Sequence, residues 1–102
     1  MRVTLTICQG PPRTVAVKSP QFLIGRAPEC DLTLVSPLVS GHHCLLTTQD
    51  DHVHVRDLRS CNGTGVNNQR LAGERPLRDG DELWVATTPI QVHIQKGRNA
   101  GL

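Results

Sequence analysis

Apolar and polar residues alternate one by one along several short stretches, and this alternation constrains the fold more than any other feature of the chain. In an extended segment, Val3, Leu5 and Ile7 would face one side, and Thr4 and Thr6 the other. The same alternation recurs at residues 15–17, 22–24, 44–46, 53–55, 83–85 and 90–94. Because successive side chains of a β-strand point to opposite faces, the pattern predicts strands with one buried face.

Turn-forming residues separate these stretches at short intervals. They occur at Gly10-Pro11-Pro12, Gln49-Asp50-Asp51, Asn67-Asn68, Asp79-Gly80 and Thr88-Pro89. The Asn-Asn pair suits a two-residue hairpin, since asparagine tolerates the left-handed backbone region. No segment of ten or more residues has helical periodicity. Many short strands with frequent turns predict an all-β protein, an antiparallel sandwich or barrel without substantial helix.

The length of 102 residues suits one domain with one core. The alternating pattern is lost after Lys96, and the chain contains no internal repeat. We therefore expect a single domain over residues 1–96 and a flexible tail or linker over residues 97–102.

The composition favours a folded cytoplasmic protein. Hydrophobic residues make up 37% of the chain, too many for a disordered segment, and no apolar run approaches membrane length. The alternating N-terminus lacks the continuous apolar block of a signal peptide. We therefore expect neither a membrane association nor export.

Four cysteines are far apart in the sequence, at Cys8, Cys30, Cys44 and Cys61, with no Cys-x-x-Cys pair. This spacing argues against a zinc knuckle and against a redox motif. In a chain without an export signal we expect free thiols, most of them buried. We expect no metal and no cofactor.

The formal net charge of +2 is too small to indicate nucleic-acid binding through bulk electrostatics. Aromatic residues are only 2% of the chain, so it has no platform on which single-stranded bases could stack. Any recognition of an anion must therefore be local.

Three short segments combine into one candidate anion site. They are Ile24-Gly25-Arg26, Val39-Ser40-Gly41-His42-His43, and the loop from Asp57 to Gly65, which has no apolar period. In a sandwich, loops from separate strand pairs can meet at a common end. Arg26 offers a planar fork of charged donors, Ser40 a hydroxyl, and Asn62 both a donor and an acceptor suited to a peptide backbone. The combination suits a phosphate or a carboxylate bound next to a peptide backbone.

These segments resemble the signature of the forkhead-associated (FHA) domain. The resemblance rests on Phe22-Leu23-Ile24-Gly25-Arg26, Ser40-Gly41-His42-His43, Asp57-Leu58-Arg59-Ser60-Cys61-Asn62-Gly63-Thr64, and the late turn Leu77-Arg78-Asp79-Gly80-Asp81. It runs from about Phe22 to Val85. The resemblance implies a sandwich of about eleven strands that recognises phosphothreonine in a partner protein, with no catalytic residue. We expect the domain to act as a monomer.

The resemblance also implies roles for individual residues. Arg26 and Ser40 would bind the phosphate, and Asn62 would hold the backbone of the phosphopeptide. Gly41, Arg59, Ser60 and Cys61 would lie close enough to add contacts, and Leu38 would select residues C-terminal to the phosphothreonine. A structural role is implied for Gly25, His43, Gly63 and Thr64.

Two departures from the family pattern stand out. Cys61 occupies a position where many members carry a hydroxyl residue that touches the phosphate, and a thiol is a weaker donor. Gly65 replaces a bulky residue common after the Asn-Gly-Thr segment. The first departure bears on affinity, and the second bears on packing.

Other interpretations of the same residues remain open. Arg26 could pair with Asp31 or Asp57, Ser40 could cap a turn, Asn62-Gly63 could be a tight turn, and Arg59 could be a solvated loop charge. Ser40, His43 and Asp57 could form a hydrolase triad, although no nucleophile-elbow glycines surround Ser40. His52 and His54 could hold a metal ion. The same scaffold could also assemble complexes without phosphate, through a sheet face.

Overall fold

The computed structural model describes residues 1–96, and these residues form eleven strands and no helix. The strands are β1 (Arg2–Ile7), β2 (Arg13–Val17), β3 (Gln21–Gly25), β4 (Leu32–Thr33), β5 (Cys44–Gln49), β6 (His52–Asp57), β7 (Thr64–Val66), β8 (Gln69–Arg70), β9 (Glu74–Leu77), β10 (Glu82–Val85) and β11 (Thr88–Gln95). This confirms the predicted all-β sandwich of about eleven strands. The expected tail over residues 97–102 lies outside the described residues.

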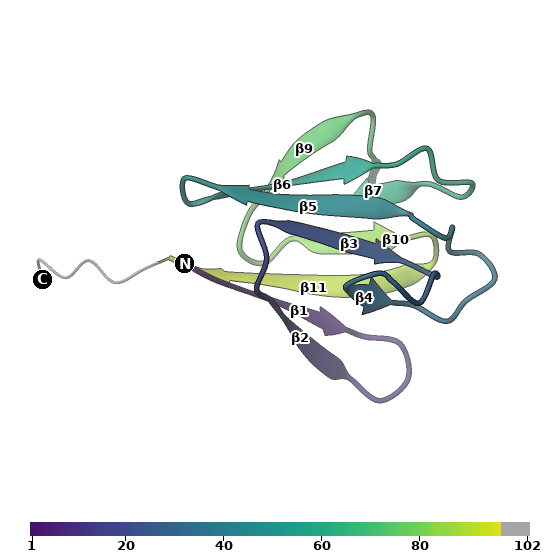
Figure 1. Cartoon of the computed structure of the whole chain (residues 1–102). Coiled ribbons are helices and arrows are strands. Elements are labelled where there is room, and N and C mark those ends of the chain that lie inside the picture. Colours follow the sequence, from purple (N-terminus) through teal and green to yellow (C-terminus); the bar gives the residue numbers. More distant parts are fainter. Residues whose placement is uncertain (97–102) are drawn as a thin grey trace, which may run out of the picture.

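Two sheets pack face to face (Figure 1). One has six strands in the order β2-β1-β11-β10-β7-β8, and the other has five in the order β4-β3-β5-β6-β9. All pairs are antiparallel except β3 with β4, which is parallel and short. The long β1–β11 pairing joins the beginning of the domain to its end, with Arg2 opposite Gln95.

The core between the sheets is built from the residues that the alternation placed on one face. Leu5, Ile24, Val55, Leu83 and Ile90 are completely buried. Burial of such side chains stabilises the fold by about 1.5–3 kcal/mol each. Val15 and Val17 are only half-buried because β2 is an edge strand.

Two tight turns close hairpins where the sequence predicted them, whereas Thr88 and Pro89, also predicted as a turn, lie in β11 and the turn before it is at Ala86 and Thr87. Asp50 and Asp51 join β5 to β6 with φ angles of 52° and 62°, and Asn67 and Asn68 join β7 to β8 with 50° and 69°. Two successive positive φ angles match the twist of antiparallel strands, and aspartate and asparagine tolerate them. The Asn-Asn hairpin is therefore confirmed.

The candidate loops lie at one end of the sandwich. The connections β3–β4, β4–β5, β6–β7 and β10–β11 all emerge there, opposite the end where β1 begins and β11 finishes (Figure 1). The two sheets thus hold segments far apart in sequence at a common rim. Among residues 1–96, no helix is long and apolar enough to cross a membrane.

Candidate functional site

Backbone hydrogen bonds bring the segments carrying Arg26 and Ser40 together. The N–H of Arg26 donates to the carbonyl of Ser40 at 2.9 Å, and the N–H of Ala27 donates to that of Gly41 at 3.1 Å. β3 ends at Gly25, so Arg26 is the first residue of the loop. The predicted meeting of these two segments is present in the structure.

Gly25 permits this close approach. A Cβ atom at Gly25 would lie 2.1 Å from the carbonyl oxygen of Gly41 and 3.0 Å from the Cys30 sulfur, which leaves no space for any side chain. The Cys30 thiol itself donates to the Gly41 carbonyl at 3.2 Å. The structural role expected of Gly25 therefore has a steric basis.

His43 braces the loops from beneath, and its side chain is completely buried. Its Nδ1 accepts a hydrogen bond from the Ser40 N–H at 3.1 Å, so Nε2 carries the proton and donates to the Gly63 carbonyl at 2.8 Å. The ring thereby connects the loop before β5 to the loop before β7. Its two nitrogens are both used in this support.

Ser40 and Asn62 are linked across the same two loops. The Ser40 hydroxyl oxygen accepts the Cys61 N–H at 2.9 Å, and the Asn62 carboxamide donates to the Leu38 carbonyl at 2.7 Å. Among the described residues the Ser40 hydroxyl has no acceptor for its proton, so it can still donate to a bound anion. Asn62 keeps its carbonyl oxygen and one N–H for a peptide.

Asp57 organises the loop between β6 and β7. Its carboxylate accepts the Ser60 hydroxyl at 2.5 Å, the Ser60 N–H at 3.0 Å and the buried Thr64 hydroxyl at 2.7 Å. Burial alone would raise the pKa of Asp57, but these hydrogen bonds outweigh it and hold the pKa below its usual value. This role was missed in the sequence, although an aspartate three residues before a serine is a recognisable local turn.

Ser60 serves the loop internally. Besides donating to Asp57, its hydroxyl accepts the Gly63 N–H at 2.9 Å. Gly63 has a φ of +86°, and a Cβ there would also lie 2.9 Å from the Arg70 guanidinium. The Ser60 hydroxyl is therefore engaged before any ligand arrives.

Arg26 is exposed at the rim, and its guanidinium has no ion-pair or hydrogen-bond partner among residues 1–96. Asp31, one of the two partners considered for it, accepts the Leu23 N–H at 2.8 Å, and Asp57 is occupied by Ser60 and Thr64. The structure forms neither ion pair.

The remaining predicted residues lie on the exposed side of the same loops. Arg59 is exposed and has a φ of +56°, Leu38 is 44% exposed, Cys61 is exposed, and Gly41 is half-buried. Leu38 is held at the rim by the bond from Asn62 to its carbonyl.

A further pair braces the rim and was not expected from the sequence. His42 and Glu29 lie 2.8 Å apart, both substantially exposed, and connect the loop after β3 to the loop before β5. The hydrogen bond from His42 is the main reason that the pKa of Glu29 is lowered. The His42–Glu29 pair is thus a second connection between these two loops, in addition to the backbone hydrogen bond between Arg26 and Ser40.

The geometry favours neither a hydrolase triad at Ser40, His43 and Asp57 nor a metal site at His52 and His54. Both His43 nitrogens bond to backbone groups, so in this arrangement neither can accept a proton from the Ser40 hydroxyl. Within residues 1–96, no group of three metal-ligating side chains comes together at His52 and His54 or elsewhere.

The four cysteines are all free thiols, two buried and two exposed, so the expectation that most would be buried was too strong. Burial raises the pKa of Cys44 to about 12 and also raises that of Cys30. Both buried thiols are therefore poor nucleophiles at neutral pH. Cys8 and Cys61 are exposed.

Comparison with known proteins identifies the class of protein that this fold and loop set define. The family model for the FHA domain matches residues 22–86, the region that contains all three candidate loops. The chain therefore belongs to the FHA domain family.

Curated relatives share this domain within much longer proteins. The transcriptional regulatory protein EmbR of Mycobacterium tuberculosis is 32% identical over 76% of this chain, which corresponds to 20% of EmbR. The ABC transporter ATP-binding/permease protein Rv1747 of the same organism is 41% identical over 66% of this chain and 8% of its own length. The chain thus spans a fifth or less of these relatives.

Solved structures agree over nearly the whole chain. One FHA domain, from a structural and functional analysis of phosphothreonine-dependent interactions, is 30% identical with a TM-score of 0.88, covering 94% of this chain and 99% of that one. The FhaA FHA domain, complexed with the intracellular domain of Rv3910, is 32% identical with a TM-score of 0.84, covering 89% and 99%.

Proposed function

We propose that this FHA domain is a recognition module that binds a phosphothreonine-containing segment of a partner protein through the loops at one end of the sandwich. Similar FHA domains support the proposal. One was analysed for phosphothreonine-dependent interactions, and EmbR, which is 26% identical in structural alignment, was solved with a low-affinity phosphopeptide. The domain acts as a monomer and binds neither nucleic acid nor membrane.

The observation that carries the proposal is the convergence of unused donors at one rim. Among residues 1–96 the Arg26 guanidinium has no partner and the Ser40 hydroxyl proton has no acceptor, and a backbone hydrogen bond joins the two residues. In the proposal Arg26 and Ser40 bind the phosphate, while Gly41, Arg59 and Cys61 add contacts around it. The Ser60 hydroxyl contributes through the loop it stabilises.

The peptide itself is held by groups on either side of the phosphate. Asn62 uses its remaining carboxamide donor and acceptor to hold the peptide backbone, and Leu38 provides an exposed apolar surface for a neighbouring side chain. Gly25, His43, Gly63 and Thr64 keep these loops in register. No cofactor takes part, and the domain catalyses no reaction.

The energetics are sufficient without a large positive charge. A phosphothreonine carries about −1.5 to −2 charges at pH 7. Hydrogen bonds to charged groups contribute about 1.5–3 kcal/mol each, so two or three could support micromolar binding, roughly −8 kcal/mol, after the cost of association.

An intracellular location is part of the proposal. The chain has four unbridged cysteines, a pattern usual in reducing compartments. Protein phosphorylation on threonine would then supply the ligand in the same compartment.

A phosphopeptide-library screen followed by titration tests the proposal. A selected phosphothreonine peptide should bind wild-type protein at micromolar concentration, and its unphosphorylated twin should not. Arg26→Ala should weaken binding by about a hundredfold, through loss of a bidentate charged contact. Ser40→Ala should weaken it by about tenfold without unfolding the domain.

Arg56→Ala provides the matched control, because Arg56 is an exposed arginine on β6, outside the three loops. It should bind the peptide as wild type does. Equal binding of the phosphorylated and unphosphorylated peptides would contradict the proposal and favour a phosphate-independent assembly domain. Ester turnover that disappears with Ser40→Ala would instead indicate a hydrolase.

A further inference from the structure

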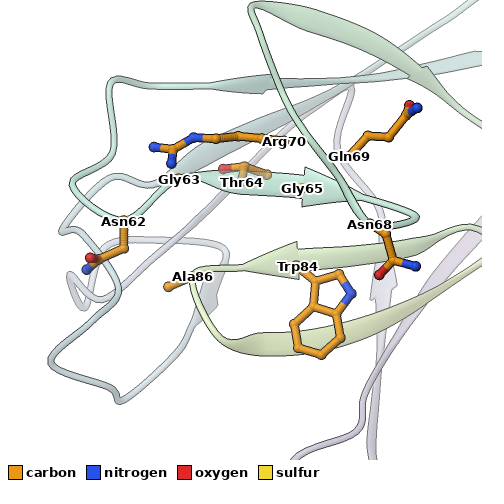
Figure 2. Close-up of a pocket in the computed structure, with 9 residues that line it drawn as sticks. All are labelled: Asn62, Gly63, Thr64, Gly65, Asn68, Gln69, Arg70, Trp84 and Ala86. Carbon is orange, nitrogen blue, oxygen red and sulfur yellow. The ribbon is translucent and has the colours of Figure 1, made fainter.

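The outer face of the six-stranded sheet has a hollow of about 220 Å³ next to the candidate site. Its floor is Gly65, which lies in register between Trp84 of β10 and Arg70 of β8. Figure 2 shows the indole of Trp84 and the side chain of Arg70 on either side of the β7 strand that carries Gly65. The hollow therefore has one aromatic wall and one cationic wall.

The hollow exists because residue 65 is a glycine. A Cβ there would lie 3.8 Å from the Trp84 Cβ and 3.3 Å from the Gln69 carbonyl oxygen, so a side chain would extend between the two walls. The φ of Gly65 is not positive, and the strand geometry therefore does not itself require glycine. The missing side chain is what leaves the space open.

Two groups in these walls are available to contact a ligand, the ring face of Trp84 and the guanidinium of Arg70. The Trp84 indole N–H donates to Glu82 at 3.0 Å, which leaves its ring face for apolar contact. The Arg70 side chain is exposed and has no hydrogen-bond or ion-pair partner among residues 1–96. Because the Arg70 guanidinium lies against Gly63, its charge faces the turn that also contains Asn62.

The hollow is continuous with the proposed peptide-binding loops. Asn62 lines it, and the same side chain bonds to Leu38 at the rim. Only Gly63 and Thr64 separate Asn62 from Gly65 in the chain, and even a fully extended backbone would place their Cα atoms no more than about 10 Å apart. An extended peptide bound at Asn62 could reach the hollow within a few residues of its phosphothreonine.

We infer that this hollow is a second subsite, which binds an acidic side chain of the same phosphopeptide. The inference rests on the proposed function. The carboxylate would pair with Arg70, and the methylene groups of the side chain would pack on the Trp84 ring. A lysine or arginine would be repelled by Arg70. A purely apolar side chain would bury the guanidinium without a partner, which is unfavourable.

A position scan tests the inference. In a phosphothreonine peptide with alanine at the neighbouring positions, glutamate is placed at each position in turn and the dissociation constant is measured. Glutamate at one of these positions should tighten binding by about three- to tenfold. This is the range we expect for one charged hydrogen bond at a solvent-exposed site. The gain should decrease at high salt because exposed charges are screened.

Two variants locate the effect. Arg70→Gln should abolish the gain from glutamate and leave the affinity for the all-alanine phosphopeptide unchanged. Gly65→Val should also abolish it by filling the hollow, with folding checked by thermal unfolding. Arg56→Gln, an exposed arginine on the other sheet, should retain the gain.

The outcomes separate this subsite from the proposed function. If the phosphothreonine peptide binds but no glutamate position gives a gain, or if the gain survives Arg70→Gln, the subsite is wrong and the proposed function stands. If no phosphothreonine peptide binds at all, the proposed function fails and the subsite fails with it.

Discussion

The hydroxyl oxygen of Ser40 accepts a hydrogen bond from the backbone N–H of Cys61 at 2.9 Å. This bond joins the β4–β5 loop to the β6–β7 loop, and it occupies an oxygen lone pair of Ser40 while leaving the hydroxyl proton free. Together with the bond from the Ser40 N–H to His43, it holds Ser40 from two sides. Residue 61 is therefore next to the group proposed to bind the phosphate.

Cys61→Thr should tighten phosphothreonine binding by about two- to fivefold. The backbone bond to Ser40 is retained, and the new hydroxyl replaces a thiol, which is a weaker donor. One neutral hydrogen bond contributes about 0.5–1.5 kcal/mol. Calorimetric titration with one phosphopeptide measures the change, and Cys61→Ala should show no gain. An affinity unchanged by threonine would place the Cys61 side chain away from the phosphate.

Gly25→Ala should destabilise the domain by about 3 kcal/mol or more. The added methyl group would lie 2.1 Å from the Gly41 carbonyl oxygen, so β3 and the Ser40–Gly41 segment must separate. Gly41→Ala is the matched control, since a Cβ at Gly41 meets nothing within 4 Å. Denaturant unfolding should show a loss for the first variant and little change for the second. Equal stability of the two variants would refute the steric account.

Asn62→Asp should weaken phosphopeptide binding more than Asn62→Ala. Alanine removes the bond to the Leu38 carbonyl and the proposed peptide contacts, at a loss of about tenfold. Aspartate keeps the shape but places a carboxylate oxygen against the Leu38 carbonyl oxygen, and it adds negative charge beside the phosphate. Together these two effects should weaken phosphopeptide binding by roughly another tenfold. Titrating both variants with one peptide checks the order. Stronger binding by the aspartate variant would count against Asn62 as a peptide contact.

The Asp57 carboxylate should make the stability of the domain depend on acidic pH. Because its folded-state pKa is below the usual value, its contribution is fully present above about pH 4 and is lost as the pH falls through the folded-state pKa. Denaturant unfolding of wild type and Asp57→Asn should show wild type more stable at pH 7, with the difference shrinking below about pH 4. A difference that stays constant over this range would exclude the carboxylate as its source.

Much of the fold could be predicted because alternation reports directly which side chains are buried. Leu5, Val55 and Leu83 lie in the core as their period of two indicates. The alternation did not indicate β4, which has only two residues, or β9, which contains Pro76 and turns Arg75 inward to bond Gln69. A proline within a short run usually argues against a strand.

The site was predictable to the extent that it follows local motifs. The loops carrying Arg26, Ser40 and Asn62 could be recognised, and the structure brings them to one rim. The hollow floored by Gly65 could not be recognised, because it depends on the register of three strands that pair Trp84 with Gly65 and Gly65 with Arg70. Such pairing is a property of the sheet as a whole.

Amide chemical-shift mapping during titration with a phosphothreonine peptide tests the central claim most directly. The largest shifts should fall on Arg26, Ser40, Gly41, Cys61 and Asn62, the residues whose loops meet at the rim, and the unphosphorylated peptide should produce none. The account would be contradicted if the largest shifts fell along β5 and β6 while the loop amides stayed unchanged.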